Sequence, residues 1–456
     1  MKKIDLFLII SLLLVSTGLL AQAPVSDEDR FFYSEDASED MAFLTPDTSY
    51  KTKGFQYGVI LNPVLVYEKD SGSSLTSSII NARVWGKSAL WNNSFLYIRV
   101  KNSYLAVLAD TGTAYGGIEN DNVLDLDLAY FSQSTASGNI VFSAGRKYYN
   151  LGTGVVLNGR GDGAELLYFS RLVDVKVFGL YTGLLLKDNN PYGLSTRDIA
   201  DGAERIFAGG QLATSVSNQN LYIFGMAQID QADEDAGTKS RYNSQYYGAG
   251  ANGVFLKDFF YYGEFIYETG ESYVSDTYEK STIAAYAVNT GLNYYIPVKL
   301  NPVLSLQYAY GSGDKDRNDY TTGNRGSSTE DDSGFISFGT FSGGFALKPT
   351  LSNIHIFRGG ASFTPFAEAQ SPYIKKMTAG VKYAYYMKDV AESSIKSGAA
   401  GEDNKHIGHG VDLSLRWQIF YDMSFYLNYG IFLPGDAYSD AQEDIHYIQS
   451  GFNFSF

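Results

Sequence analysis

The sequence contains no cysteine, and it has only 10 prolines and four histidines among its 456 residues. Without cysteine there is no disulfide framework, no lipid-anchored cysteine and no zinc site built on thiolates. Beyond the N-terminal segment there is also no run of about 18 apolar residues, so the sequence predicts no membrane-spanning helix. These absences argue against small disulfide-rich scaffolds, zinc-finger proteins and helical membrane proteins.

Aromatic residues and glycine are abundant, with 37 Tyr, 29 Phe and 47 Gly, and yet the mean hydropathy is slightly negative. A soluble chain of this length would usually divide into domains with helical segments. Here there is little helical periodicity and no composition break that resembles a linker. A single transmembrane β-barrel accounts for both facts, because alternating strands face lipid with only half of their side chains.

The N-terminus predicts export from the cytoplasm. Lys2 and Lys3 precede an apolar run from Leu6 to Leu14, and the small-residue site Ala21-Gln22-Ala23 follows, as in a secretory signal peptide. Residues 24–52 are acidic and aperiodic, and we expect them to form a flexible periplasmic leader. Residues 53–456 then form the predicted barrel.

The clearest strands lie at the C-terminus. From Val411 to Ile419 every odd position is apolar and every even position is polar, and the same alternation resumes after a turn at Tyr421 and Asp422. This pattern predicts an antiparallel hairpin with one apolar and one polar face. The final alternating strand ends on Phe456, which is similar to the last strand of bacterial outer-membrane barrels.

The same alternation predicts an all-β fold, a transmembrane antiparallel up-and-down β-barrel of about 18 strands. Long polar connections alternate with short turns after the first hairpin, which is typical of bacterial barrels with long extracellular loops and short periplasmic turns. An even strand count returns both termini to the periplasm. The expected strands are 53–68, 74–89, 92–108, 121–133, 138–148, 162–170, 173–187, 205–217, 220–230, 242–256, 259–272, 281–296, 301–312, 352–368, 372–388, 407–420, 422–433 and 445–456.

Eighteen strands enclose a lumen too wide for wall side chains alone to fill. Water or an inward-folded connection must occupy it. The longest connection, residues 313–351, is the first candidate for a constriction, and residues 149–161 are the second.

Two segments resemble a known family. Gly145-Arg146-Lys147 with the following residues to Gly152 is similar to an element that follows a strand in the alginate-export family of outer-membrane porins, and the stretches 410–413 and 432–436 resemble the closing pattern of that family. The resemblance implies an eighteen-stranded barrel with an arginine-lined lumen that passes an anionic polysaccharide. It also implies that Arg146 points inward.

Alternation assigns several charged side chains to the lumen, where rings of charge set the selectivity of a channel. A basic residue on the lipid side would cost about 2–4 kcal/mol at the bilayer midplane, so inward placement is favoured. The expected solute-binding residues are Arg83, Arg99, Lys101, Arg146, Lys176, Lys382, Asp412 and Arg416. Acidic residues expected on the same face are Asp125, Asp127, Asp174, Glu264 and Glu268, together with Asp412. Basic residues clustered on one wall would guide anions, whereas interleaved charges would neutralise one another in salt-bridge networks.

Other motifs carry less weight. His406 and His409 lie three residues apart near acidic residues, but such a pair outside a helix is a weak metal signature, and we expect no metal site. Arg160-Gly161-Asp162 spells an integrin-type tripeptide, which in a glycine-rich turn is a chance match. No catalytic pattern, cofactor motif or nucleic-acid-binding patch stands out, so we expect no enzyme activity, no cofactor and no nucleic-acid partner.

The leading hypothesis is a passive channel of the bacterial outer membrane for hydrophilic solutes, with anionic saccharides as the class that the resemblance implies. Its expected partners are that solute, outer-membrane lipid and the barrel-assembly machinery. The alternative is a surface adhesin or structural barrel with a blocked lumen and acidic extracellular loops. A transporter of hydrophobic substrates is disfavoured by the polar residues on the inward face.

Overall fold

The structure is a computed structural model that describes residues 54–112, 118–185, 194, 203–231, 241–275, 277–317, 319–320, 323–326, 330–395 and 399–456. The predicted signal peptide and leader lie outside these residues. Within the described ranges no helix is both long and apolar enough to cross a membrane.

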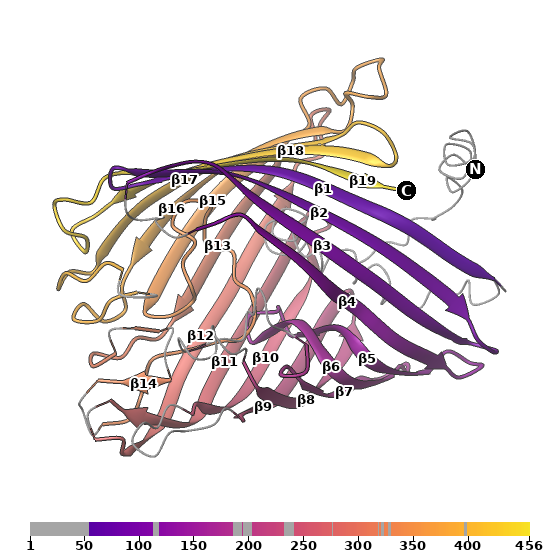
Figure 1. The fold of residues 1–456 in the computed structure, drawn as a ribbon, viewed down its shortest axis with the longest axis horizontal. Helices are drawn as coiled ribbons and strands as arrows, with labels where there is room; N and C mark the ends of the chain where they lie inside the picture. Colours follow the sequence, from indigo (N-terminus) through magenta and orange to yellow (C-terminus); the bar gives the residue numbers. More distant parts are fainter. Residues whose placement is uncertain are drawn as a thin grey trace.

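Antiparallel strands form one closed sheet, as predicted (Figure 1). The strands are β1 (Phe55–Asp70), β2 (Ser73–Ala89), β3 (Ser94–Thr111), β4 (Asp121–Ser134), β5 (Ile140–Leu151), β6 (Leu157–Tyr168), β7 (Asp174–Tyr181), β8 (Arg205–Val216), β9 (Gln219–Asp230), β10 (Asn243–Phe255), β11 (Phe259–Val274), β12 (Lys280–Tyr295), β13 (Val303–Gly311), β14 (Asn324–Arg325), β15 (Ile354–Phe363), β16 (Met377–Met387), β17 (His406–Gln418), β18 (Met423–Pro434) and β19 (Ile445–Ser455).

Eighteen of these strands make the wall, and the two-residue strand β14 runs parallel to β11 inside a connection. Each wall strand pairs with the next in sequence, and β1 pairs with β19 to close the barrel. Closure matters because an open edge in hydrocarbon would leave backbone N–H and C=O groups unpaired. In Figure 1 the front strands β1–β4 and the rear strands β9–β13 slope in opposite directions, as closure with a strand tilt requires.

Alternation places apolar side chains outside. Val84, Leu306 and Val177 are 58%, 63% and 52% exposed, whereas their polar neighbours in sequence are turned to the lumen. Both ends of the described chain lie at the barrel end that carries short turns, such as residues 217–218 and 256–258. The opposite end carries the long connections and is called the long-loop end.

Several strand boundaries differ from the sequence-based expectation, and the predicted strand 352–368 ends at Phe363. Residues 149–151 and 157–161, predicted to be part of a connection, extend β5 and β6. The predicted strand 173–187 ends at Tyr181, and the predicted strand 372–388 begins at Met377. The extension of β5 and β6 changes the lumen, because the extended hairpin does not stay in the wall.

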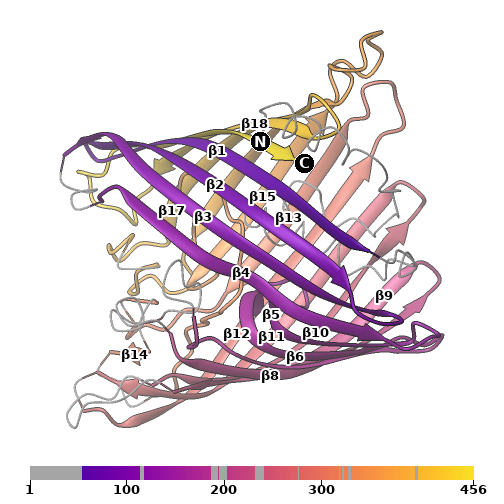
Figure 2. The same cartoon turned by 45° about the vertical axis from the view of Figure 1, so that its right-hand side comes forward.

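The tip of the β5–β6 hairpin, residues 147–161, leaves the barrel wall. Pairing of β5 with β4 stops at Arg146, and pairing of β6 with β7 stops at Asp162, while β5 and β6 remain paired with each other up to Leu151 and Leu157. The two ribbons curl beside β4 in Figures 1 and 2. The hairpin tip therefore brings a second layer of strand into the lumen.

The described part of the connection between β13 and β15, residues 312–317, 319–320, 323–326 and 330–353, also folds inward, and we call it the inward loop. Its side chains Phe335, Ile336 and Phe338 are almost fully buried and join the main apolar core with residues of the hairpin tip. Both candidate constriction segments thus enter the lumen. They pack against each other through backbone hydrogen bonds from residues 338–340 to residues 154–156, at 3.0–3.2 Å.

Candidate functional site: a charged lumen with an inward loop

A chain of ion pairs joins the lumen wall formed by β2–β4 to the outer face of the hairpin tip. We call this chain the arginine–aspartate ladder. Arg99 Nε lies 2.5 Å from Asp127 Oδ2, and Arg83 Nε lies 3.7 Å from the same atom. Arg160 of the hairpin binds both Asp127 and Asp125, the latter at 2.9 Å. The ladder therefore ties the hairpin tip to the inner surface of β4.

The ladder continues through Arg146. Its Nε and Nη2 donate to the two carboxylate oxygens of Asp162 at 2.9 and 2.7 Å, and its Nη1 lies 3.6 Å from Asp125 Oδ1. A bidentate pair of this kind fixes both distance and orientation. Four arginines meet three aspartates in the ladder, so it carries a formal charge of +1: Arg83, Arg99, Arg146 and Arg160 against Asp125, Asp127 and Asp162.

A β-bulge in β4 builds the centre of the ladder. Arg99 pairs with Leu128 and Val100 pairs with Leu126, so Asp127 is the extra residue in β4. A bulge turns two successive side chains toward the same side. Asp127 and Leu128 are accordingly both buried, at 0% and 2% exposure.

Lys101 stands beside the ladder. On β3 it lies opposite Arg83 of β2 and Asp125 of β4. Solvent in the lumen reaches this part of the wall, because the side chains of Arg160, Asp162 and Asp125 are 11%, 15% and 22% exposed. Solvent thus reaches one edge of the ladder, whereas Arg83, Arg99, Arg146 and Asp127 are almost fully buried.

A second set of predicted residues lies on another part of the wall. Lys382 of β16 and Asp412 of β17 are opposite each other, and Arg358 of β15 is close enough to interact with the Asp412 carboxylate. Asp412 also accepts a hydrogen bond from the backbone N–H of Phe345 in the inward loop, at 3.1 Å. This set therefore supports one end of the inward loop.

The last two predicted residues have separate surroundings. Arg416 donates to Asn428 at 2.9 Å, and its guanidinium lies 5.5 Å from the ring centre of Tyr426. Lys176 donates to the backbone oxygen of Asn150 at 3.1 Å and so supports the base of the hairpin tip. The eight predicted residues consequently do not form one ring.

Two acidic residues expected to face the basic ones instead hold the inward segments. Glu264 accepts hydrogen bonds from the N–H and hydroxyl of Thr153 in the hairpin tip, at 2.8 and 2.6 Å. Glu268 accepts from the Ile336 N–H at 2.9 Å and from the hydroxyls of Tyr242 and Tyr246. Both carboxylates are nearly inaccessible, so their hydrogen bonds offset the cost of burial.

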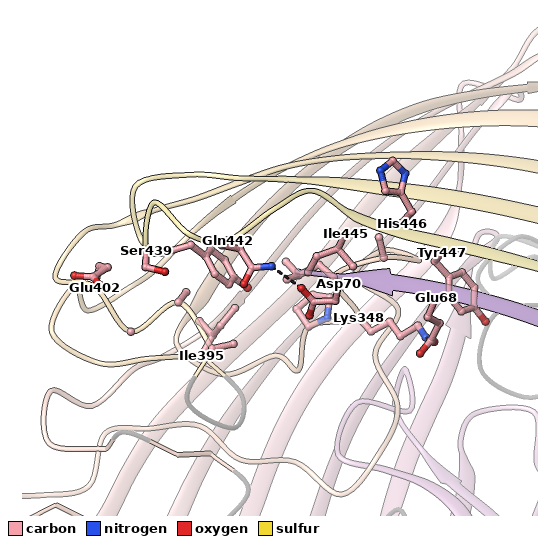
Figure 3. A pocket seen from close by; sticks show the side chains of 17 residues that line it. Glu68, Asp70, Lys348, Ile395, Glu402, Ser439, Gln442, Ile445, His446 and Tyr447 are labelled. Atoms are coloured by element: carbon pink, nitrogen blue, oxygen red, sulfur yellow. Dashed lines mark hydrogen bonds and ion pairs between the residues drawn. The ribbon is translucent and has the colours of Figure 1, made fainter. Parts of the chain in front are cut away.

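The far side of the inward loop is anchored to β1 and β19. Lys348 pairs with Glu68 and lies 3.9 Å from the ring centre of Tyr447. These residues border a cavity of about 540 Å³ near the long-loop end, where Gln442 donates to Asp70 (Figure 3). Acidic, basic, amide and aromatic side chains meet in this cavity, which is a combination suited to a hydroxylated solute.

One connection at the long-loop end has a carboxylate with a shifted pKa. Burial acts to raise the pKa of Asp389, but hydrogen bonds from His355, from the Gly313 N–H and from Tyr310 outweigh it and hold the pKa below the ordinary value. The Gly313 N–H lies 2.9 Å from this carboxylate. Asp389 thus fastens the first residues of the inward loop in its ionised form.

The sequence-based prediction does not include Arg160 and Asp162 among the lumen residues, because it places Arg160 in a connection and Asp162 at the very start of a strand. A signal for them exists, because Asn158, Arg160 and Asp162 alternate with Leu157, Gly159 and Gly161 as in a strand with one polar face. The Asn158 amide also hydrogen-bonds Thr340, which places the ladder next to the inward loop.

Comparison with known proteins agrees with this architecture. The family model described as "Alginate export" matches residues 208–448, which is 241 of the 456 residues. The chain belongs to the alginate-export family. It forms a passive channel of the bacterial outer membrane.

Solved structures with the same fold include three Pseudomonas aeruginosa proteins. OccK2 (OpdF) has a TM-score of 0.57 at 12% identity over 88% of this chain and 98% of its own. OccK1 (OpdK) gives 0.56 at 11% identity over 88% and 100%, and OccK11 (OpdR) gives 0.55 at 11% over 88% and 96%. No curated protein matches the sequence of this alginate-export channel.

Proposed function

We propose that this channel passes small hydroxylated solutes with a preference for anionic saccharides, and that the arginine–aspartate ladder is the surface that selects them. The observation that carries the proposal is the excess of arginine over aspartate in the ladder, in which Arg160 is the arginine that keeps contact with solvent. Guanidinium groups bind carboxylates through two parallel hydrogen bonds, and the aspartates orient them for this purpose. Lys101 adds a further positive charge on the same wall.

The preference should be modest. A channel must bind its solute well enough to admit it and weakly enough to release it. Because the aspartates neutralise most of the arginine charge, the ladder offers many hydrogen-bond donors with little net charge. That combination favours saccharide acids over small inorganic anions.

The position of the inward segments supports a narrow passage beside the ladder. Asn158 joins the hairpin tip to Thr340 of the inward loop, only two residues from Arg160. A solute that follows the β2–β4 wall would meet the ladder and the inward loop at the same level. The cavity beside Lys348 then lies at the long-loop end of the barrel, where a saccharide could first bind.

We also propose that both termini face the periplasm and that the long-loop end faces the outside. The support is the predicted signal peptide and the contrast between long and short connections. An epitope inserted in the 388–405 connection should bind antibody on intact cells, and one inserted at residues 256–258 should not. The reverse pattern would invert the orientation.

Planar-bilayer recordings test the solute class. Refolded protein under a KCl gradient should give stable currents with a weak anion preference, and alginate oligomers should block them. Arg160→Gln should weaken the block, whereas Arg171→Gln, in an exposed turn, should leave it unchanged. Currents with cation preference and no block would overturn the proposed selectivity, and no current at all from folded protein would favour the adhesin or structural barrel.

A further inference from the structure

The four histidines of the sequence all lie near the long-loop end, and the ring of each contacts the ring of a tyrosine. His355 contacts Tyr308, and His446 contacts Tyr429. His406 and His409 differ from these two because their rings face each other. The distance between their Nε2 atoms is 3.3 Å.

Sequence spacing alone would separate this pair. Residues three apart in a regular strand point to opposite faces. In β17, however, Gly408 pairs with Tyr386 and His406 pairs with Met387, so Ile407 is an extra residue in the strand. This bulge, with Gly408 at φ +140°, returns both imidazoles to the same side. An added Cβ at Gly408 would lie 2.2 Å from the Leu433 oxygen, so glycine is required there.

The two nitrogens are spaced as metal ligands. Zinc binds imidazole nitrogen at about 2.0–2.1 Å, so two ligands at a tetrahedral angle lie about 3.3 Å apart. The observed 3.3 Å equals this separation. The ring planes are inclined by 66°, so the two imidazoles do not stack on each other.

The outer nitrogens have the partners that metal-bound histidines use. Nδ1 of His409 lies 2.6 Å from the Tyr383 hydroxyl, and Nδ1 of His406 lies 3.8 Å from an oxygen of Asp436. The Tyr383 hydroxyl orients the His409 ring, and the Asp436 carboxylate favours a proton on His406 Nδ1 electrostatically; with Nδ1 protonated, Nε2 is left to the metal. The ring of Tyr385 packs against both imidazoles and limits their rotation.

We propose that His406 and His409 form a binding site for one borderline divalent transition-metal ion, with Zn²⁺ as the best geometric fit and Cu²⁺ and Ni²⁺ as further candidates. Among the described residues no group of three or more His, Asp or Glu side chains could complete the ligand shell. Water or a donor from another molecule would fill the remaining positions. The site faces away from the ladder and is independent of the solute that the channel carries.

The competing arrangement is a hydrogen bond in which one Nε2–H donates to the other Nε2. A metal ion would replace that shared proton. Titration with Zn²⁺ alone distinguishes the two, because a pair that keeps its hydrogen bond takes up no ion, whereas a metal site exchanges that bond for the ion.

The test uses full-length folded channel in detergent and calorimetric titration with Zn²⁺, with Cu²⁺ paramagnetic resonance as a second readout. We expect one ion per chain and a Cu²⁺ spectrum with two nitrogen ligands. His406→Gln and His409→Gln should each lower Zn²⁺ affinity at least about tenfold, and Tyr383→Phe should lower it by a smaller factor. His446→Gln removes a histidine with a similar tyrosine contact and should change nothing.

Unchanged channel conductance and gel mobility in each variant would establish that the barrel is intact. No binding by the wild-type channel would overturn the proposal. Binding that persists in the His406→Gln, His409→Gln double variant would also overturn it and would assign the ion to acidic loops. Equal loss in His446→Gln would show that the paired geometry is not the cause.

Discussion

Glu268 is the residue through which the inward loop can be tested most directly. Its carboxylate is fully buried and receives three donors: the Ile336 N–H and the hydroxyls of Tyr242 and Tyr246. Glu268→Gln keeps the size but converts one acceptor into a donor, so at least one of the three donors loses its partner. We expect the inward loop to detach more often.

The magnitude follows from the kind of bond that is lost. A hydrogen bond contributes about 0.5–1.5 kcal/mol, and a buried donor left unsatisfied costs about 1–3 kcal/mol. A loss of about 2 kcal/mol would raise the detached population of the loop about 30-fold, since about 1.4 kcal/mol corresponds to a factor of ten. The backbone bonds to residues 154–156 would still hold part of the loop.

Single-channel recording and hydrogen exchange report this change. Glu268→Gln should show more frequent transitions to a higher conductance and faster exchange in peptides covering residues 330–345. Glu271→Gln is the matched control on the same strand, because Glu271 is exposed and pairs with Lys280 at the surface. If Glu268→Gln formed a folded barrel with unchanged current and unchanged exchange, the anchoring role of Glu268 would be wrong.

Three further outcomes are expected. Replacing Arg83, Arg99 and Lys101 together with glutamine should move the reversal potential toward cation preference. An unchanged reversal potential would show that these three residues do not line the passage. Phe456→Ser should lower the yield of heat-modifiable barrel, because the backbone of Phe456 exchanges two 2.9 Å hydrogen bonds with Val59 at the closing seam and its ring stacks on the same strand; normal outer-membrane levels would contradict this. Asp389 has a pKa below its unfolded value, so its stabilisation is present above about pH 4 and is lost as the pH falls through the folded pKa. The protection of the Gly313 amide relative to its intrinsic exchange rate should therefore fall below pH 4 in the wild-type protein, and in Asp389→Asn this protection should be low and independent of pH over that range.

The alternation of apolar and polar residues within each strand was sufficient to predict the barrel wall. The alternation from Val411 to Ile419 has a period of two, and a strand between lipid and water must satisfy that period along its whole length. The strand count, the order of neighbours and the inward direction of Arg83, Arg99 and Asp412 follow from it. Connection length likewise favoured residues 313–351 as a segment that enters the lumen, but it did not single out residues 149–161, because the connections 188–204 and 389–406 are longer.

The tertiary structure decided what local pattern could not. The bulges at Asp127 and Ile407 shift parity by one residue, and the pairing partner determines a bulge, not the strand itself. Arg160 joins the ladder because the hairpin tip leaves the wall, which depends on contacts with Thr340 and Glu264, more than a hundred residues away. Alternation along one strand contains no information about such partners. The sequence by itself therefore determined the barrel, whereas long-range packing determined which charges meet inside it and which two histidines face each other at its rim.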